Sequence, residues 1–184
     1  MQGAYLVCKK LGVTDDEFYH SIQTFKGASK RLELVGRSEA LVVYKDFAHS
    51  PSKLKATTEA VKEQFSKRNI IACMELHTFS SLNENFLEQY KGSMDSADEA
   101  IVYFNPHTIE HKKLKPIAIE QVRAAFARND IKVFNDSTLL QQYLEQKNYK
   151  HDILLLMSSG NFDGININEF GKALIAKADK AIAN

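Results

Sequence analysis

The chain has 184 residues, of which 44% are hydrophobic and 26% are charged, and its formal net charge is +1. This is the composition of an ordinary globular domain, and the nearly balanced charge argues against a nucleic-acid-binding surface. No apolar run reaches the roughly 18–20 residues that a membrane span needs, and two isolated cysteines make no disulfide framework, so we expect a reduced, cytoplasmic protein.

The first 27 residues have the pattern of two helices. The opening, "MQGAYLVCKKLG", reads as the inside of a helix rather than as a natural start, so we expect the chain to be a piece of a larger protein. Thr14 is a good N-cap for the second helix, and Glu17 at the third helical position completes a capping box. The polar, glycine-containing segment that follows reads as a hinge, which places a domain boundary at about residues 30–34.

Strand and helix patterns alternate beyond this hinge. Two neighbouring strands, 32–36 and 40–47, are expected to form a hairpin, and a helix begins at Pro51 with Ser50 as its N-cap. The later strands are expected at 70–75, 99–104, 131–134 and 152–157, and the later helices at 80–94, 116–128, 137–147 and 167–182. Strands that are apolar throughout belong in a parallel sheet covered on both faces. The sequence therefore predicts an α/β fold, a Rossmann-like doubly wound, mostly parallel sheet with an antiparallel N-terminal hairpin.

Polar segments follow the ends of the expected strands. Ligands of doubly wound sheets bind beyond the carboxyl ends of the strands. That edge would carry five segments rich in Asp, His, Asn and Ser, namely 45–51, 75–81, 104–108, 134–137 and 157–164. We therefore expect the functional site on this edge.

Asp46 and His49 stand three residues apart where a strand gives way to a helix. The acid could accept hydrogen bonds from a ribose, while His49 and the following helix N-terminus favour a phosphate. Alternatively, Asp46 caps a backbone amide and His49 is an ordinary surface residue. The spacing alone does not decide between these two readings.

The other candidates are weaker when each is taken by itself. The backbone amides of "MSSGNFDG" (157–164) could hold a carboxylate, or the segment could be an ordinary left-handed turn. His77 could contact a ligand or simply fill a polar loop. His107 and His111 are four residues apart, but the adjacent proline and basic residues argue against a metal site. No GxxxxGK[ST] motif occurs, so the chain lacks a phosphate-cradling loop of its own.

Several segments together resemble the C-terminal domain of the Mur ligases, the ATP-dependent amide-forming enzymes of peptidoglycan synthesis. "DFAHSP" (46–51) resembles a motif that this family shares with the folylpolyglutamate synthetases, and "MSSGNFDGI" (157–165) resembles a segment of the murein peptide ligases. "FKGASKRLEL" (25–34) is similar to the family's join between domains. "ELHTFSSLNENFLEQY" (75–90) and "ADEAIV" (97–102) are similar to the segments that follow the next strand.

This resemblance implies a domain division and a set of site residues. Residues 1–33 would be a helical remnant of the central domain with the hinge, and residues 34–184 the C-terminal domain, which binds the amine substrate. Asp46 and His49 would bind ATP. The substrate-binding residues would be His77, Ser158, Ser159, Asn161 and Phe162. The P-loop, the Mg²⁺ ligands and the catalytic residues would lie in the missing central domain, and the missing N-terminal domain would hold the nucleotide sugar. This piece alone would then have no metal site, no catalytic residue and no activity.

The resemblance also implies a reaction, in which ATP activates the carboxylate of UDP-N-acetylmuramate as an acyl phosphate that an amine then attacks. The ending at 157–165 favours the tripeptide L-Ala-γ-D-Glu-meso-diaminopimelate as the amine, in peptidoglycan recycling. The alternatives are L-alanine and, less favoured, the C-terminal domain of a folylpolyglutamate synthetase. A non-catalytic receiver-like module is disfavoured, because the paired acids and the lysine that a receiver needs are missing.

Overall fold

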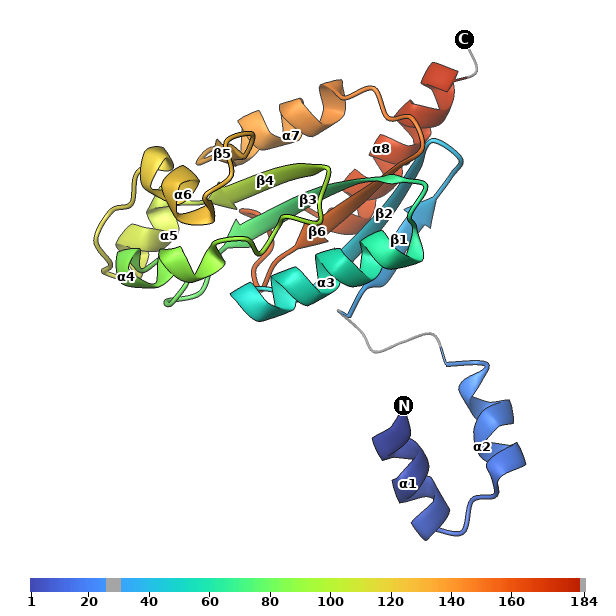
Figure 1. The fold of residues 1–184 in the computed structure, drawn as a ribbon. Helices are drawn as coiled ribbons and strands as arrows, with labels where there is room; N and C mark the ends of the chain where they lie inside the picture. The colour runs from blue at the N-terminus through green and yellow to red at the C-terminus, as the bar shows by residue number, and fades with distance from the viewer. Residues whose placement is uncertain (26–30, 183–184) are drawn as a thin grey trace.

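The computed structural model describes residues 1–25 and 31–182, and its centre is a six-stranded sheet (Figure 1). The strands lie in the order β1-β2-β6-β3-β4-β5. Strands β1 and β2 are antiparallel, and all the other neighbours are parallel. This confirms the predicted fold, including the N-terminal hairpin. The strands are β1 (Glu33–Arg37), β2 (Leu41–Asp46), β3 (Asn69–Leu76), β4 (Glu99–Phe104), β5 (Lys132–Phe134) and β6 (Asp152–Met157).

The helices alternate with these strands along the chain. They are α1 (Gln2–Lys10), α2 (Asp15–Ile22), α3 (Pro51–Gln64), α4 (Glu84–Leu87), the 3₁₀ turn η1 (Glu88–Tyr90), α5 (Pro106–His111), α6 (Ile119–Phe126), α7 (Ser137–Gln146) and α8 (Ile167–Ile182). The capping box of α2 is confirmed, because the Thr14 hydroxyl accepts the Glu17 N–H and the Glu17 carboxylate accepts the Thr14 N–H.

The region 80–94 differs from the expectation of one continuous helix, which was wrong. The Asn83 side chain accepts the Asn85 N–H, so the helix begins only at Glu84. The chain turns out of the helical region at Lys91 and adopts a left-handed conformation at Gly92. Leu87, Tyr90 and Met94 are nevertheless buried, and short turns place them over the sheet as a longer helix would have done. Helix α5 was not expected; Asn105 caps it and Pro106 occupies its first position.

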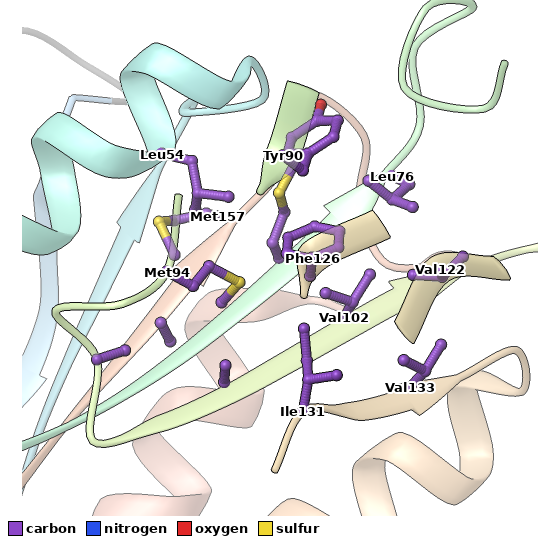
Figure 2. Close-up of a cluster of buried hydrophobic side chains, with 14 of the residues drawn as sticks. Leu54, Leu76, Tyr90, Met94, Val102, Val122, Phe126, Ile131, Val133 and Met157 are labelled. Atoms are coloured by element: carbon purple, nitrogen blue, oxygen red, sulfur yellow. The ribbon is translucent and has the colours of Figure 1, made fainter. Parts of the chain in front are cut away.

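Both faces of the sheet are covered, because successive strand residues point to opposite sides. One core cluster lies between the sheet and helices α3 and α6, as Figure 2 shows for Leu54, Val102, Val122, Phe126 and Met157. The other lies beneath α7 and α8 and includes Leu140, Leu144, Phe170 and Leu174. Burial on both sides explains why the central strands are apolar throughout.

Helix α8 packs unusually close to the β1–β2 hairpin. A Cβ on Gly171 would lie 2.8 Å from Val35 Cγ1, and a Cβ on Gly36 would lie 2.9 Å from Ile175 Cδ1. Both glycines are therefore needed for the approach of helix to strand. This packing places the start of α8 beside the carboxyl end of β2.

Helices α1 and α2 form a pair that Figure 1 shows apart from the sheet. The ring of Tyr5 contacts the rings of Phe18 and Tyr19, and its hydroxyl donates to Asp15 at 2.8 Å. No residue of α1 is buried. Residues 26–30 of the expected hinge "KGASKR" (26–31) lie outside the described residues, and the domain boundary stays a prediction.

Candidate functional site

A crevice opens where the chain leaves neighbouring strands toward opposite faces of the sheet. From β2 the chain passes to α3 on one face, and from β6 it passes to α8 on the other. Such a switch point leaves a ligand-sized gap beyond the strand ends. The cleft has a volume of about 240 Å³, and it is lined by Lys45, Asp46, Phe47, Leu156, Ser158, Ser159, Gly160, Ile165, Asn166, Ile167 and Asn168. The structure thus brings together two candidate segments, 45–51 and 157–164, which are more than 100 residues apart in the chain.

The Asp46 carboxylate is bonded to backbone amides on both sides. It accepts the Leu32 N–H at 2.5 Å and the Ala48 N–H at 2.7 Å. These bonds tie the residue before β1 to the turn after β2, which is the capping role considered from the sequence. A carboxylate has about four acceptor positions, so two lone pairs remain for a ligand. Its role in nucleotide binding stays a prediction.

The His49 ring is held by its own turn. Nδ1 lies 2.9 Å from the Phe47 carbonyl oxygen, and since a carbonyl only accepts, Nδ1 carries a proton. The ring packs edge-on against the Phe47 ring. Ser50 makes no side-chain cap bond, so the first N–H groups of α3 are not used by it. This turn has the donors that a phosphate requires.

The polar groups of the loop after β6 bond to one another and to Glu75 on β3. The Ser158 hydroxyl donates to the Glu75 carboxylate, and its oxygen accepts the Gly160 N–H at 2.6 Å. The Ser159 hydroxyl oxygen is buried, and the described residues offer it no hydrogen-bond partner. Because Ser159 lines the cleft, this hydroxyl is the polar group there that a ligand could satisfy.

Asn161 and Phe162 shape the loop rather than line the cleft. The Asn161 side-chain oxygen accepts the Gly164 N–H at 3.0 Å. The Phe162 side chain is only 2% exposed and stacks on Tyr103 inside the core. One side chain thus caps a turn and the other anchors the loop in the core, and the expected role of both residues in substrate binding stays a prediction.

Glu75, near the end of β3, and His77, just after it, lie against the loop that follows β6. The His77 side chain is 34% exposed, and its Nδ1 lies 3.5 Å from Glu75 Oε1. The Glu75 side chain is 2% exposed and also accepts the Phe162 N–H at 2.9 Å. The sequence reasoning did not single out Glu75. The available signal was an acid near the end of the otherwise apolar strand "IIACMEL".

The acids give this edge of the sheet a negative character. Burial raises the pKa of Tyr103 to about 12, and the neighbouring charges of Asp163 and Glu75 add to the shift. Lys45 lines the cleft, but its ammonium lies 3.0 Å from the Glu33 carboxylate, which offsets its charge.

Neither a metal-binding cluster nor a membrane-spanning helix is found among the described residues. The part of the chain that the structure describes has no group of three or more His, Cys, Asp or Glu side chains placed to bind a metal ion. None of its described helices is both long and apolar enough to span a bilayer.

Comparison with known proteins gives a consistent family. A family model described as "Mur ligase, glutamate ligase domain" matches residues 30–160. A UDP-N-acetylmuramate–L-alanine ligase from Caldanaerobacter subterraneus is 31% identical over 153 residues, which is 82% of this chain and 33% of the relative. The corresponding enzyme from Desulfitobacterium hafniense is 25% identical over 171 residues, covering 92% of this chain and 37% of the relative. The chain thus spans about a third of the length of the curated relatives it matches.

Solved structures share the fold at lower identity. A UDP-N-acetylmuramate–alanine ligase from Thermotoga maritima has a TM-score of 0.68 at 14% identity, over 96% of this chain and 36% of the other. A murein peptide ligase from Psychrobacter arcticus has a TM-score of 0.61 at 20% identity, over 86% of this chain and 32% of the other.

Proposed function

This chain belongs to the Mur ligase family, as its C-terminal domain, and from that premise we propose that it binds the amine substrate of an ATP-dependent ligase of peptidoglycan synthesis. In the complete enzyme, ATP transfers its terminal phosphate to the carboxylate of UDP-N-acetylmuramate, which gives an acyl phosphate and ADP. The amine attacks this carbonyl carbon, phosphate leaves, and an amide forms. The expected cytoplasmic location follows from the need for ATP.

The observation that carries this proposal is the meeting of two loops in one cleft. The Ser158 N–H donates to the Asp46 carbonyl oxygen at 3.0 Å, so the nucleotide-binding and amine-binding candidates lie side by side. We propose that Asp46 and His49 hold ATP, and that His77 with Ser158 and Ser159 holds the amine. An amine so placed would face the phosphate end of the nucleotide, which the reaction requires.

Other domains must complete the site. We propose that the central domain supplies the Mg²⁺ ligands, as the family resemblance implies, and the phosphate-cradling loop, since the GxxxxGK[ST] motif does not occur in this sequence. We propose that residues 1–33 are the end of that domain and the hinge. The exposure of Leu6, Val7 and Leu11 supports this, since an apolar surface of that kind is normally covered by a neighbour.

For the amine we propose the tripeptide L-Ala-γ-D-Glu-meso-diaminopimelate. The ending "MSSGNFDGI" resembles the murein peptide ligases. L-Alanine is the second candidate, because the curated relatives named above are alanine ligases.

The test is an assay of the intact ligase with UDP-N-acetylmuramate, ATP and each amine in turn. A higher kcat/KM with the tripeptide is expected, and a clear preference for L-alanine would select the second candidate. If neither amine is joined to the nucleotide sugar, the proposed function is wrong.

The same assay examines the nucleotide side of the cleft. Asp46→Ala should raise the KM for ATP, because a charge-assisted hydrogen bond of about 1.5–3 kcal/mol is lost. Asp136→Ala is the matched control, since Asp136 also caps backbone amides, those of Thr138 and Leu139, but lies outside the cleft. Equal losses of thermal stability with no change in ATP kinetics for either variant would leave Asp46 with a capping role alone.

A further inference from the structure

Glu75 is a carboxylate in a place where the sheet otherwise buries apolar side chains. Along β3, Ile71 and Cys73 on the same face belong to the core beneath α7 and α8. Burial raises the pKa of the Cys73 thiol, and the charge of Glu75 adds to the shift. Moving a charged group into such surroundings is costly unless it is fully paired.

The pairing of Glu75 is made by the loop after β6 rather than by a basic residue. One carboxylate oxygen, Oε2, accepts both the Ser158 hydroxyl and the Phe162 N–H. The other, Oε1, faces His77 Nδ1 at 3.5 Å. Among the described residues, His77 is the one basic side chain with a nitrogen within 4.0 Å of this carboxylate.

The loop is closed so tightly on Glu75 that it leaves no room for a side chain. A Cβ on Gly160 would lie 2.8 Å from Glu75 Oε2 and 2.7 Å from His77 Nδ1. Phe162 and Asp163 then adopt positive φ angles of 51° and 63°, which non-glycine residues avoid. The Phe162 N–H bond to Glu75 and the burial of the Phe162 ring hold this conformation in place.

Glu75 has no Lys or Arg partner in the described part of the chain, so its burial is not expected to stabilise the fold. Even a buried ion pair can often be replaced by apolar residues with a neutral or stabilising effect. We infer that Glu75 is a positioning residue for the amine substrate. It shapes the 158–162 loop through Ser158 and Phe162, and its charge favours a proton on His77 Nδ1. The His77 Nε2 lone pair is then left to accept an N–H of the incoming amine. This inference rests on the proposed function, and Glu75 itself touches no substrate.

Glu75→Gln tests the inference, because it keeps the size of the side chain and removes the charge. In the intact ligase, the KM for the amine should rise by about tenfold or more, and the KM for ATP should change by less than about twofold. In this chain, ¹⁵N NMR should show His77 changing from the Nδ1–H tautomer to a mixture.

Asp152→Asn is the matched control. Asp152 is also buried, accepts the Lys150 N–H at 2.7 Å and the Asn69 side chain at 3.1 Å, and lies at the opposite end of the sheet. It should lower thermal stability without changing the KM for the amine or the His77 tautomer. If Glu75→Gln behaves in the same way, Glu75 is a structural acid only and the inference is overturned.

Two further outcomes have a clear meaning, namely that Glu75→Gln fails to fold or that the intact ligase joins no amine. If Glu75→Gln does not fold, His77→Gln at the partly exposed rim replaces it, and an unchanged KM for the amine overturns the inference. If the intact ligase joins no amine at all, the proposed function fails. The NMR comparison of Glu75→Gln with wild type then still decides whether Glu75 sets the tautomer of His77.

Discussion

Acidic side chains have different bonding partners at the two ends of the sheet. At the amino end, carboxylates are paired with cations: Asp98 with Lys62, Glu99 with Lys147 and Lys132, and Asp130 with Arg128. At the carboxyl end, Asp46 and Glu75 are bonded mainly to backbone N–H groups and one hydroxyl. Asp152, also at the amino end, is an exception, because it is bonded to the Lys150 N–H and to the Asn69 side chain. Most acids at the amino end are thus paired with a Lys or Arg of the domain, whereas Asp46 and Glu75 at the carboxyl end accept hydrogen bonds from uncharged groups.

The largest expected effect comes from filling the space beside Glu75. Gly160→Ala would bring the new methyl group to 2.7 Å from His77 Nδ1 and 2.8 Å from Glu75 Oε2, so these side chains or the loop must shift and the contact between them is disturbed. We expect kcat/KM for the amine to fall about a hundredfold, because small displacements of positioning groups are that costly. Stability should fall by about 1–3 kcal/mol.

Gly164→Ala serves as the control for this change. Gly164 lies in the same loop at a φ of +86°, and a Cβ there meets nothing within 4 Å. It should cost about 1 kcal/mol of backbone strain and leave most of the ligation rate. Equal loss of activity in both variants would mean that the loop needs flexibility rather than contact with Glu75. Steady-state kinetics and thermal unfolding decide between them.

The amino end should show an intermediate effect that depends on pH. Burial acts to raise the pKa of Glu99, but hydrogen bonds from Lys147 and Tyr143 outweigh it and hold this pKa below its usual value. Lys147 Nζ lies 2.5 Å from the carboxylate, so Lys147→Met should lower the free energy of unfolding by about 1–2 kcal/mol at pH 7.

The sign of the pH dependence follows from the lowered pKa. The stabilisation is complete above the ordinary glutamate pKa of 4.5 and is lost as the pH falls through the lower, folded-state value. Denaturant unfolding of Lys147→Met and wild type should therefore give converging stabilities below about pH 4. A difference that stays constant down to pH 2 would assign the effect to packing instead.

The smallest effect is expected at the surface pair of the same end. Lys62 Nζ lies 2.7 Å from the Asp98 carboxylate, but both side chains are more than a third exposed. Lys62→Ala should therefore cost less than about 1 kcal/mol, and added salt should reduce that cost. A loss as large as that of Lys147→Met would show that exposure does not separate these two pairs.

The sequence predicted the fold well where periodicity and burial agree. Strands β4 and β6 and helix α8 have the expected bounds, because long apolar runs or a strong helical repeat define them. The region 80–94 was misjudged, because its apolar spacing fits a helix while Asn83 and Gly92 limit the regular turns.

The site was predicted in outline but not in its internal contacts. Asp46 and Ser158 were placed on the correct edge by the rule for parallel sheets. The role of Glu75 could not be read from the sequence, because it depends on a loop more than 80 residues further along the chain. For the same reason the burial of the Phe162 ring could not be read from the sequence.

The form of the outer strands has a consequence for solubility. An open sheet presents unpaired backbone groups along its edges, where a second chain can add and start aggregation. Here one edge strand, β5, has only three residues. The other, β1, carries Glu33 and Arg37 at its ends, and its pairing register shifts between Leu34 and Gly36. Short length, charge and an irregular register each discourage the addition of another strand, so the domain can keep an open sheet without polymerising through it.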